Sequence, residues 1–254
     1  MSALLDVQGV SISFGGLKAV QDFRLAIPRG GLHGLIGPNG AGKTTVFNLL
    51  TGVYVPQAGD VLLDGVRLNG LAPHRIAAAG LARTFQNIRL FKELSVLDNV
   101  RIACHQRTQV SVAGALLRTF GWMGEEAALT EASLALLARF GLDGRAQEAA
   151  GGLPYGDQRR LEIARALALR PKVLLLDEPA AGMNPQEKVA LRQLIRTIRD
   201  DLDLTVLLIE HDMGLVMDLC EHITVLDHGQ VIAAGTPAAV QDDPKVIEAY
   251  LGTG

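Results

Sequence analysis

A glycine-rich run in the first fifth of the chain constrains its fold more than any other feature. Residues 37–45 read Gly-Pro-Asn-Gly-Ala-Gly-Lys-Thr-Thr. The largely apolar stretch Leu32–Ile36 precedes this run, and a helix-like stretch at residues 46–50 follows it. The order strand, glycine-rich loop and helix is the context in which the pattern G-x-x-x-x-G-K-[ST] holds phosphates. The sequence therefore predicts an α/β fold with a phosphate site at this loop.

Each residue type in the run has a physical reason. The backbone must curl around phosphates with its N–H groups inward, which side chains at Gly37 and Gly42 would obstruct. The following helix adds the positive end of its dipole. Lys43 would reach the β- and γ-phosphates, and the Thr44 hydroxyl would hold Mg²⁺. The residues predicted to bind the nucleotide are Gly37, Pro38, Asn39, Gly40, Ala41, Gly42, Lys43, Thr44 and Thr45. A glycine-rich turn with an accidental lysine is the alternative, which the flanking strand and helix disfavour.

A second motif, at residues 173–178, is an apolar run that ends in two acids. A strand without polar alternation is typical of the middle of a parallel sheet, where both faces are buried. Acids at its carboxyl end face the ligand crevice. Asp177 would then hold the Mg²⁺ shell, and Glu178 would polarise a water against the γ-phosphate. The alternative is a pair of acids that caps the following helix. Two acids in this place favour a hydrolase.

Residues 153–167 connect the chain to a family. They read Leu-Pro-Tyr-Gly-Asp-Gln-Arg-Arg-Leu-Glu-Ile-Ala-Arg-Ala-Leu and resemble the signature motif and following helix of the ABC ATPases. The resemblance covers essentially the whole chain. It implies an α/β P-loop NTPase (RecA-like) core, an antiparallel β-subdomain and a helical subdomain. It also implies that Phe14 stacks on adenine, that Gln86 belongs to the Q-loop and that His211 is the switch histidine. The implied catalytic residues are Glu178, His211 and Gln86, and the implied magnesium ligands are Thr44, Gln86 and Asp177.

Two of these residues also have ordinary structural interpretations. An aromatic residue such as Phe14 near a strand is commonly part of a core or a strand surface. A glutamine such as Gln86 commonly faces solvent. His211 follows an apolar run at residues 206–209, so a place at the ligand edge of the sheet is expected for it. The remaining histidines show no spacing typical of a metal site.

The signature departs from the usual family pattern. Pro154 and Tyr155 stand where many relatives carry Ser and Gly, and Asp157 stands where they carry Gln. The serine hydroxyl that would reach the nucleotide of a second chain is therefore missing. A helix that begins near Asp157 can still present backbone N–H groups to an anion. We therefore expect Tyr155, Gly156 and Asp157 to contact the partner's nucleotide. Asn184 replaces the aspartate that usually follows the acidic pair.

Four segments narrow the resemblance to the ATPases of branched-chain amino acid importers: the signature, residues 180–185, residues 86–91 and the tail with Gly235 and Tyr250. This resemblance implies ATP and Mg²⁺ as cofactors, two transmembrane permease subunits, and a second ATPase subunit that is the same or a homologous chain. A substrate-binding protein would take part indirectly, and the chain would lie on the cytoplasmic face of the inner membrane as a peripheral subunit. ATPases of lipopolysaccharide exporters or urea importers look similar, and a soluble ABC protein acting on DNA or ribosomes is a third possibility.

Composition limits these possibilities. A formal charge of −3 gives no basic field for nucleic acid, so no nucleic-acid partner is expected. Two distant cysteines form no disulfide framework, which is consistent with a reducing compartment. Residues 1–10 have no basic n-region or apolar h-region, so no signal peptide is expected there. The best membrane candidate, residues 110–124, is too short to span and contains Arg118. Its apolar side, including Phe120, Trp122 and Met123, would dock on permease subunits or close the helical subdomain's own core.

The chain is expected to form one ABC ATPase domain over residues 4–254. Residues 1–94 and 160–235 would form the core and β-subdomain, residues 95–159 the helical subdomain, and residues 236–254 a tail. Alternating patterns predict the β-subdomain at residues 4–13, 17–27 and 59–69. The predicted core strands are Leu32–Ile36, 81–85, 173–176, 206–209 and 222–226. Helical periodicity follows from residue 95 to 142. A hairpin at Gly229 and a short helix at residues 245–251 would close the chain.

Overall fold

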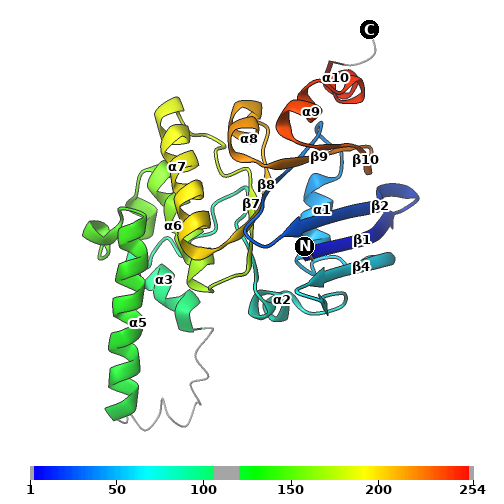
Figure 1. Ribbon diagram of the computed structural model, residues 1–254. Coiled ribbons are helices and arrows are strands. Elements are labelled where there is room, and N and C mark those ends of the chain that lie inside the picture. The colour runs from blue at the N-terminus through cyan, green and yellow to red at the C-terminus, as the bar shows by residue number, and fades with distance from the viewer. Residues whose placement is uncertain (1–2, 106–119, 252–254) are drawn as a thin grey trace. The chain divides into compact units, whose positions relative to one another are not determined.

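A computed structural model describes residues 3–105 and 120–251 of the chain. The chain divides into two compact units, one formed by Met1–Gln86 with Lys172–Gly254 and the other by Asn87–Pro171. The second unit begins earlier and ends later than the helical subdomain expected at residues 95–159. The α/β architecture predicted from the sequence is confirmed, and both sheets lie in the first unit (Figure 1).

The smaller sheet is antiparallel and has the strand order β2-β1-β4-β5. Its strands are β1 (Ala3–Phe14), β2 (Leu17–Pro28), β4 (Ala58–Leu63) and β5 (Val66–Arg67). This sheet is the predicted β-subdomain, but the stretch expected at residues 59–69 is a hairpin of two strands. Asp64 and Gly65 join them with φ angles of 53° and 77°. Positive φ at both central residues is the requirement of a type I′ turn, which Asp-Gly supplies.

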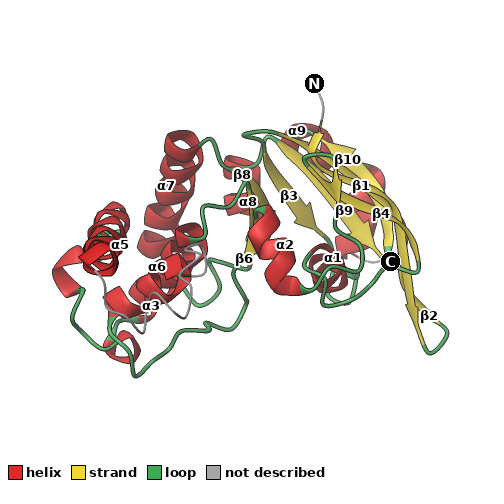
Figure 2. Cartoon of the chain, turned by 90° about the horizontal axis from the view of Figure 1, so that it is seen from below, coloured by secondary structure: helices red, strands yellow, loops and turns green. Residues whose placement is uncertain are grey.

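The larger sheet has the order β10-β9-β3-β8-β7-β6. Its strands are β3 (Leu32–Ile36), β6 (Leu81–Arg83), β7 (Val173–Asp177), β8 (Thr205–Ile209), β9 (His222–Asp227) and β10 (Gln230–Gly235) (Figure 2). All neighbours pair in parallel except β10, which pairs antiparallel with β9. Every residue of β3, β7 and β8 is buried, and for β7 the apolar run predicted this. Parallel pairing brings the carboxyl ends of these three strands to one edge, where ligands bind in open α/β sheets.

The helices of the first unit are α1 (Lys43–Leu50), α2 (Pro73–Ala79), α7 (Pro185–Leu202), α8 (Met213–Leu219), α9 (Pro237–Gln241) and α10 (Pro244–Leu251). The apolar side chains of α1 pack with both sheets, since one buried cluster contains Phe47 together with Phe23 of β2 and Leu175 of β7. Helix α8 covers β3, because a Cβ atom on Gly34 would lie 3.2 Å from the Val216 side chain. The core therefore fixes the position of the loop between β3 and α1.

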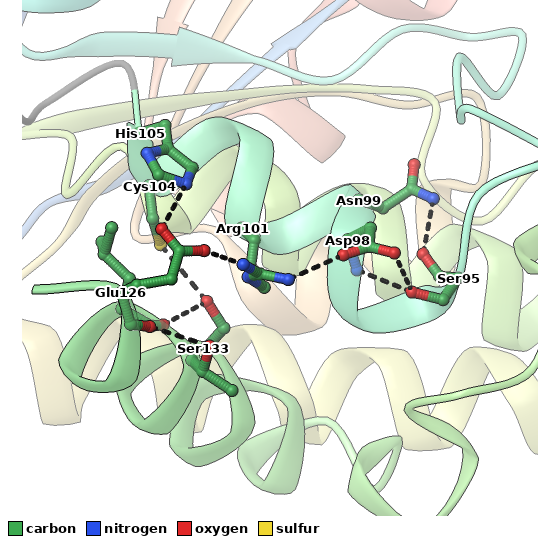
Figure 3. Close-up of polar contacts among 10 residues, drawn as sticks. Ser95, Asp98, Asn99, Arg101, Cys104, His105, Glu126 and Ser133 are labelled. Atoms are coloured by element: carbon green, nitrogen blue, oxygen red, sulfur yellow. Dashed lines mark hydrogen bonds and ion pairs between the residues drawn. The ribbon is translucent and has the colours of Figure 1, made fainter. Parts of the chain in front are cut away.

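The second unit is helical, as predicted. It contains α3 (Val96–His105), α5 (Phe120–Arg139), α6 (Tyr155–Ala168) and two short 3-10 helices, Asp143–Arg145 and Ala150–Gly152. Polar contacts join α3 to α5. Arg101 pairs with both Asp98 and Glu126, and the Cys104 Sγ atom lies 3.7 Å from the Ser133 Oγ atom (Figure 3). Ser133 is buried.

Most of the predicted docking segment at residues 110–124 lies outside the described residues. Residues 106–119 and the side chains of Phe120, Trp122 and Met123 lie outside the described part of the chain. Among the residues that are described, no helix combines the length and the apolar character needed to cross a bilayer.

Candidate nucleotide-binding site

The predicted phosphate loop connects β3 to α1. Helix α1 begins at Lys43, inside the motif, rather than at residue 46 as expected. Gly37 has a φ of 151°, and a Cβ atom there would lie 1.9 Å from the Leu226 carbonyl oxygen. Gly42 has a φ of 105°, and its Cβ atom would lie 2.6 Å from the Ala19 carbonyl oxygen. Both positions therefore require glycine, for close approach of backbone as well as for conformation.

The Lys43 side chain lies within the loop. Its Nζ atom donates to the carbonyl oxygens of Gly37, at 2.6 Å, and Pro38, at 2.9 Å. Burial lowers the pKa of Lys43, while the nearby charges of Glu178 and Asp177 raise it. Phosphate oxygens bond an ammonium group more strongly than neutral carbonyls do. The loop therefore holds the Lys43 ammonium where an anionic ligand can replace the two carbonyl oxygens as its hydrogen-bond acceptor.

Glu178 follows the last residue of β7 and adopts a φ of 47°. A residue other than glycine in the left-handed region is uncommon, and such residues cluster at functional sites. The Glu178 N–H group donates to the carbonyl oxygen of Ile209, the last residue of β8, at 2.9 Å. This bond fixes the turn at the carboxyl edge of the sheet.

The three predicted catalytic residues meet at the Glu178 carboxylate. The Gln86 Nε2 atom donates to Oε2 at 2.7 Å, and the His211 Nε2 atom donates to Oε1 at 2.7 Å. The Glu178 side chain is 15% exposed and the His211 side chain 44%. Residues that are far apart in sequence thus form one cluster because β6, β7 and β8 end at the same edge of the sheet.

Glu210 is a structural member of the site that the sequence analysis missed. Its buried carboxylate accepts hydrogen bonds from the N–H groups of Ala180, at 2.7 Å, His211, at 3.0 Å, and Asp212, at 3.4 Å. Burial raises the pKa of Glu210, and these three donors lower it. The carboxylate ties the loop after β7 to the loop after β8. The place of Glu210 directly after an apolar strand was the sequence signal that could have identified it.

The predicted magnesium ligands Thr44, Gln86 and Asp177 offer hydroxyl, amide and carboxylate oxygens. Oxygen ligands of this kind suit Mg²⁺, which proteins bind through one or two carboxylates together with substrate phosphates. The donor set therefore fits the ion. Arg83, which the sequence analysis did not single out, donates from Nη2 to the Asp177 Oδ2 atom at 2.6 Å.

Phe14, the predicted adenine-stacking residue, ends β1 and is 42% exposed. Its ring lies edge-on to that of Tyr54, with the centroids 5.0 Å apart. An aromatic ring that packs against one neighbour and remains partly exposed can stack on a base. Its exposure argues against the ordinary interpretation of Phe14 as part of the core.

The signature residues belong to the second unit, whereas the site described above belongs to the first. Helix α6 begins at Tyr155, earlier than the expected start near Asp157, so Tyr155, Gly156 and Asp157 all lie in its first turn. The Asp157 carboxylate pairs with Arg145 at 2.8 Å. This pair reduces the repulsion that Asp157 would exert on an anion at the helix start.

The C-terminal helix also contacts the phosphate loop. The Gly37 N–H group donates to the phenol oxygen of Tyr250 on α10, and burial raises the pKa of that phenol. The sequence analysis named Tyr250 only as part of a tail typical of a subfamily. Its position shows that the tail contacts the start of the phosphate loop.

Comparison with known families agrees with this geometry. Residues 20–181 match the family described as ABC transporter. The chain belongs to the ABC transporter family. Residues 230–254 match a second family, described as Branched-chain amino acid ATP-binding cassette transporter. The predicted resemblance is thereby confirmed.

Individual relatives of this ABC protein match over nearly its whole length. The high-affinity branched-chain amino acid transport ATP-binding protein BraF of Pseudomonas aeruginosa is 47% identical, and LivG of Escherichia coli K12 is 46% identical, each over 98% of both chains. The lipopolysaccharide export system ATP-binding protein LptB of Escherichia coli K12 is 32% identical over 98% of both chains. A crystal structure of an ATP-binding cassette of an ABC transporter in its ADP conformation is 30% identical, with a TM-score of 0.86 over the full length of both chains.

ATP-binding subunits of ABC transporters are ATPases coupled to transport, and this chain is such a subunit. An ABC ATPase domain of this kind binds ATP and ADP.

Proposed function

We propose that this ABC ATPase powers an importer of branched-chain amino acids from the cytoplasmic face of the inner membrane. The observation that best supports the proposed substrate is the identity of 46–47% to BraF and LivG over 98% of the chain. The match of residues 230–254 to a branched-chain amino acid family supports it. The lower identity of 32% to LptB disfavours lipopolysaccharide export.

The residues of the first unit have distinct roles in this proposal. Backbone N–H groups of the loop and the Lys43 ammonium bind the phosphates, and Phe14 stacks on adenine. Thr44, Gln86 and Asp177 hold Mg²⁺. When bound, this ion neutralises the charge that develops on the transferred phosphoryl group.

Glu178 orients the attacking water and accepts its proton. Both of its carboxylate oxygens are bonded, one to Gln86 and one to His211. Each oxygen can accept a second hydrogen bond, and release of one of these donors would free a further acceptor position for the attacking water. His211 is the donor suited to move, because its imidazole can transfer its hydrogen bond to the γ-phosphate. ATP binding is thereby linked to formation of the catalytic arrangement.

Two chains pair in the proposed cycle. Tyr155, Gly156 and Asp157 cover the nucleotide of the partner, and for two identical chains the two-fold interface is closed and isologous. ATP closes the pair and hydrolysis opens it. The partners are two transmembrane permease subunits and a second ATPase subunit, either the same chain or a homologue. A substrate-binding protein delivers the amino acid to the permeases.

Purification of the tagged chain from membranes, with mass spectrometry of the bound proteins, tests this assignment. We expect two permeases, a second ATPase and an amino-acid-binding protein. Ribosomal or DNA-repair proteins without a membrane protein would overturn the transport role. Permeases accompanied by lipopolysaccharide-transport or urea-binding proteins would overturn the substrate but not the ATPase role.

A further inference from the structure

Arg83 is a buried cation beside the proposed magnesium ligand Asp177. It is the last residue of β6, and its side chain is 7% exposed. Its Nη2 atom donates to the Asp177 Oδ2 atom at 2.6 Å, and its Nη1 atom donates to the Asn48 Oδ1 atom at 2.8 Å. Asn48 lies on α1, the helix whose first turn contains Thr44. One guanidinium therefore bonds the elements that contain two of the three proposed magnesium ligands.

Aromatic rings hold the same guanidinium in place. Its carbon lies 5.3 Å from the ring centroid of Phe47 and 5.1 Å from that of Phe85. Both distances are within the range of cation–π attraction. Phe85 precedes Gln86, so the cation is also fixed by the segment that contains the Q-loop glutamine. A planar guanidinium can stack and bond at two points in this way, whereas a lysine ammonium cannot.

Stability alone is a weak explanation for this pair. Removing both charges from water is costly, and buried ion pairs are often no more stabilising than apolar residues of similar size. The Nε atom of Arg83 is buried and finds no hydrogen-bond partner among the described residues, which adds to the cost. A buried pair with this cost, next to the reaction site, calls for a functional explanation.

We propose that Arg83 is a positioning residue for Asp177: it engages Oδ2 and so presents Oδ1 of the same carboxylate to the Mg²⁺ that accompanies ATP. A carboxylate has two oxygens and can accept from two partners at once. Among the described residues, Arg83 is the one that hydrogen-bonds the Asp177 carboxylate, and it uses Oδ2 only. Partners that orient a metal ligand commonly contribute to metal affinity. The inference rests on the proposed role of Asp177.

The affinity of a fluorescent ATP analogue, measured in Mg²⁺ and in EDTA, tests the inference without relying on turnover. The ratio of the two affinities gives the enhancement by Mg²⁺. We expect Arg83→Met and Arg83→Lys to reduce this enhancement about tenfold, a coupling of ordinary size for neighbouring groups, with affinity in EDTA unchanged. Arg67→Met is the matched control, since Arg67 forms an exposed pair with Asp60. If Arg83→Met does not fold, Arg83→Lys, which keeps the positive charge, is the variant that tests the inference.

A double-mutant cycle separates this inference from the proposed function. Asp177→Asn alone should remove most of the enhancement, and adding Arg83→Met should then change nothing further. If Asp177→Asn keeps the wild-type enhancement, the metal role of Asp177 is wrong. If Asp177→Asn loses it while both Arg83 variants keep or increase it, only the role of Arg83 is wrong. An additional loss from Arg83→Met in the Asp177→Asn background would also overturn that role.

Discussion

The Nε2 atom of His211 lies 2.7 Å from the Oε1 atom of Glu178. Gln86 donates to the other oxygen of the same carboxylate, so both oxygens are engaged. Each oxygen can still accept one further hydrogen bond, and a rearrangement that releases one donor would free another acceptor position for a water on the proposed base. Because the γ-phosphate is an alternative acceptor for His211, the rearrangement can be coupled to nucleotide binding.

Glu178→Gln should stop turnover while preserving ATP binding. The amide keeps the size of the side chain but cannot accept a proton, and loss of a general base typically lowers the rate by about 10²–10⁴-fold. We expect ATP to be retained in a closed pair of chains, observed as an ATP-dependent dimer in size-exclusion chromatography. Glu248→Gln, an exposed glutamate on α10, is the control. Hydrolysis by Glu178→Gln at the wild-type rate would show that the catalytic assignment is wrong.

His211→Ala should lower kcat more than it changes KM for ATP. The histidine acts on charge that develops during hydrolysis, and removing one such donor commonly costs about 10²–10³-fold in kcat. Steady-state hydrolysis by the assembled transporter measures both constants. His228→Ala is the matched control, because that side chain is 94% exposed. An unchanged kcat with a higher KM would assign His211 to binding alone.

Gly37→Ala should abolish nucleotide binding, whereas Gly40→Ala should be mild. A methyl group at Gly37 would meet the Leu226 carbonyl oxygen at 1.9 Å, so the loop must move. At Gly40 nothing lies within 4 Å, and the cost is the strain of a φ of 81°, about 1 kcal/mol. Calorimetric titration with ATP and thermal unfolding compare the two. Equal affinities in both variants would contradict the close approach at Gly37.

Because of His33, the free energy of unfolding should be lower in mild acid than at neutral pH. Burial, and secondarily the charge of His222, lower its pKa from 6.5 to about 4. Below pH 6.5 the unfolded chain therefore binds a proton that the folded chain rejects until about pH 4. The free energy of unfolding should fall across this window by up to about 3 kcal/mol from this residue.

Urea unfolding between pH 7 and pH 4 measures this contribution of His33. The variant His33→Gln should lose that part of the pH dependence, and His228→Gln, an exposed control, should retain it. The Nε2 atom of His33 lies 2.9 Å from the Thr224 Oγ1 atom, so His33→Gln also lowers stability at neutral pH. An unchanged slope in His33→Gln would contradict the assigned pKa.

Local patterns predicted much of the fold and the site. A largely apolar run predicted β3, and apolar runs predicted β7 and β8. Glu178 and His211 were expected at the carboxyl ends of β7 and β8, where ligands bind in open α/β sheets. Helix starts were less accurate. Helix α1 begins within the glycine-rich motif, and α6 begins directly after Pro154, a residue type that is favoured near helix starts.

Glu210 and Arg83 were missed for a different reason. Their roles depend on partners that are distant in sequence: Ala180 for Glu210, and Asn48 and Asp177 for Arg83. A lone acid or arginine has no periodicity that reveals such partners. The signature residues differ from Glu210 and Arg83. Their motif is recognisable in the sequence, although the nucleotide that they are proposed to cover is bound by another chain.

Uptake of radiolabelled leucine into proteoliposomes tests the central claim most directly. The vesicles would contain the chain with its two permeases and its second ATPase subunit, ATP inside, and the binding protein with leucine outside. We expect leucine to accumulate only with ATP inside, and Glu178→Gln to abolish the accumulation. ATP hydrolysis by the assembled complex without leucine uptake, together with movement of urea or lipopolysaccharide, would contradict the account.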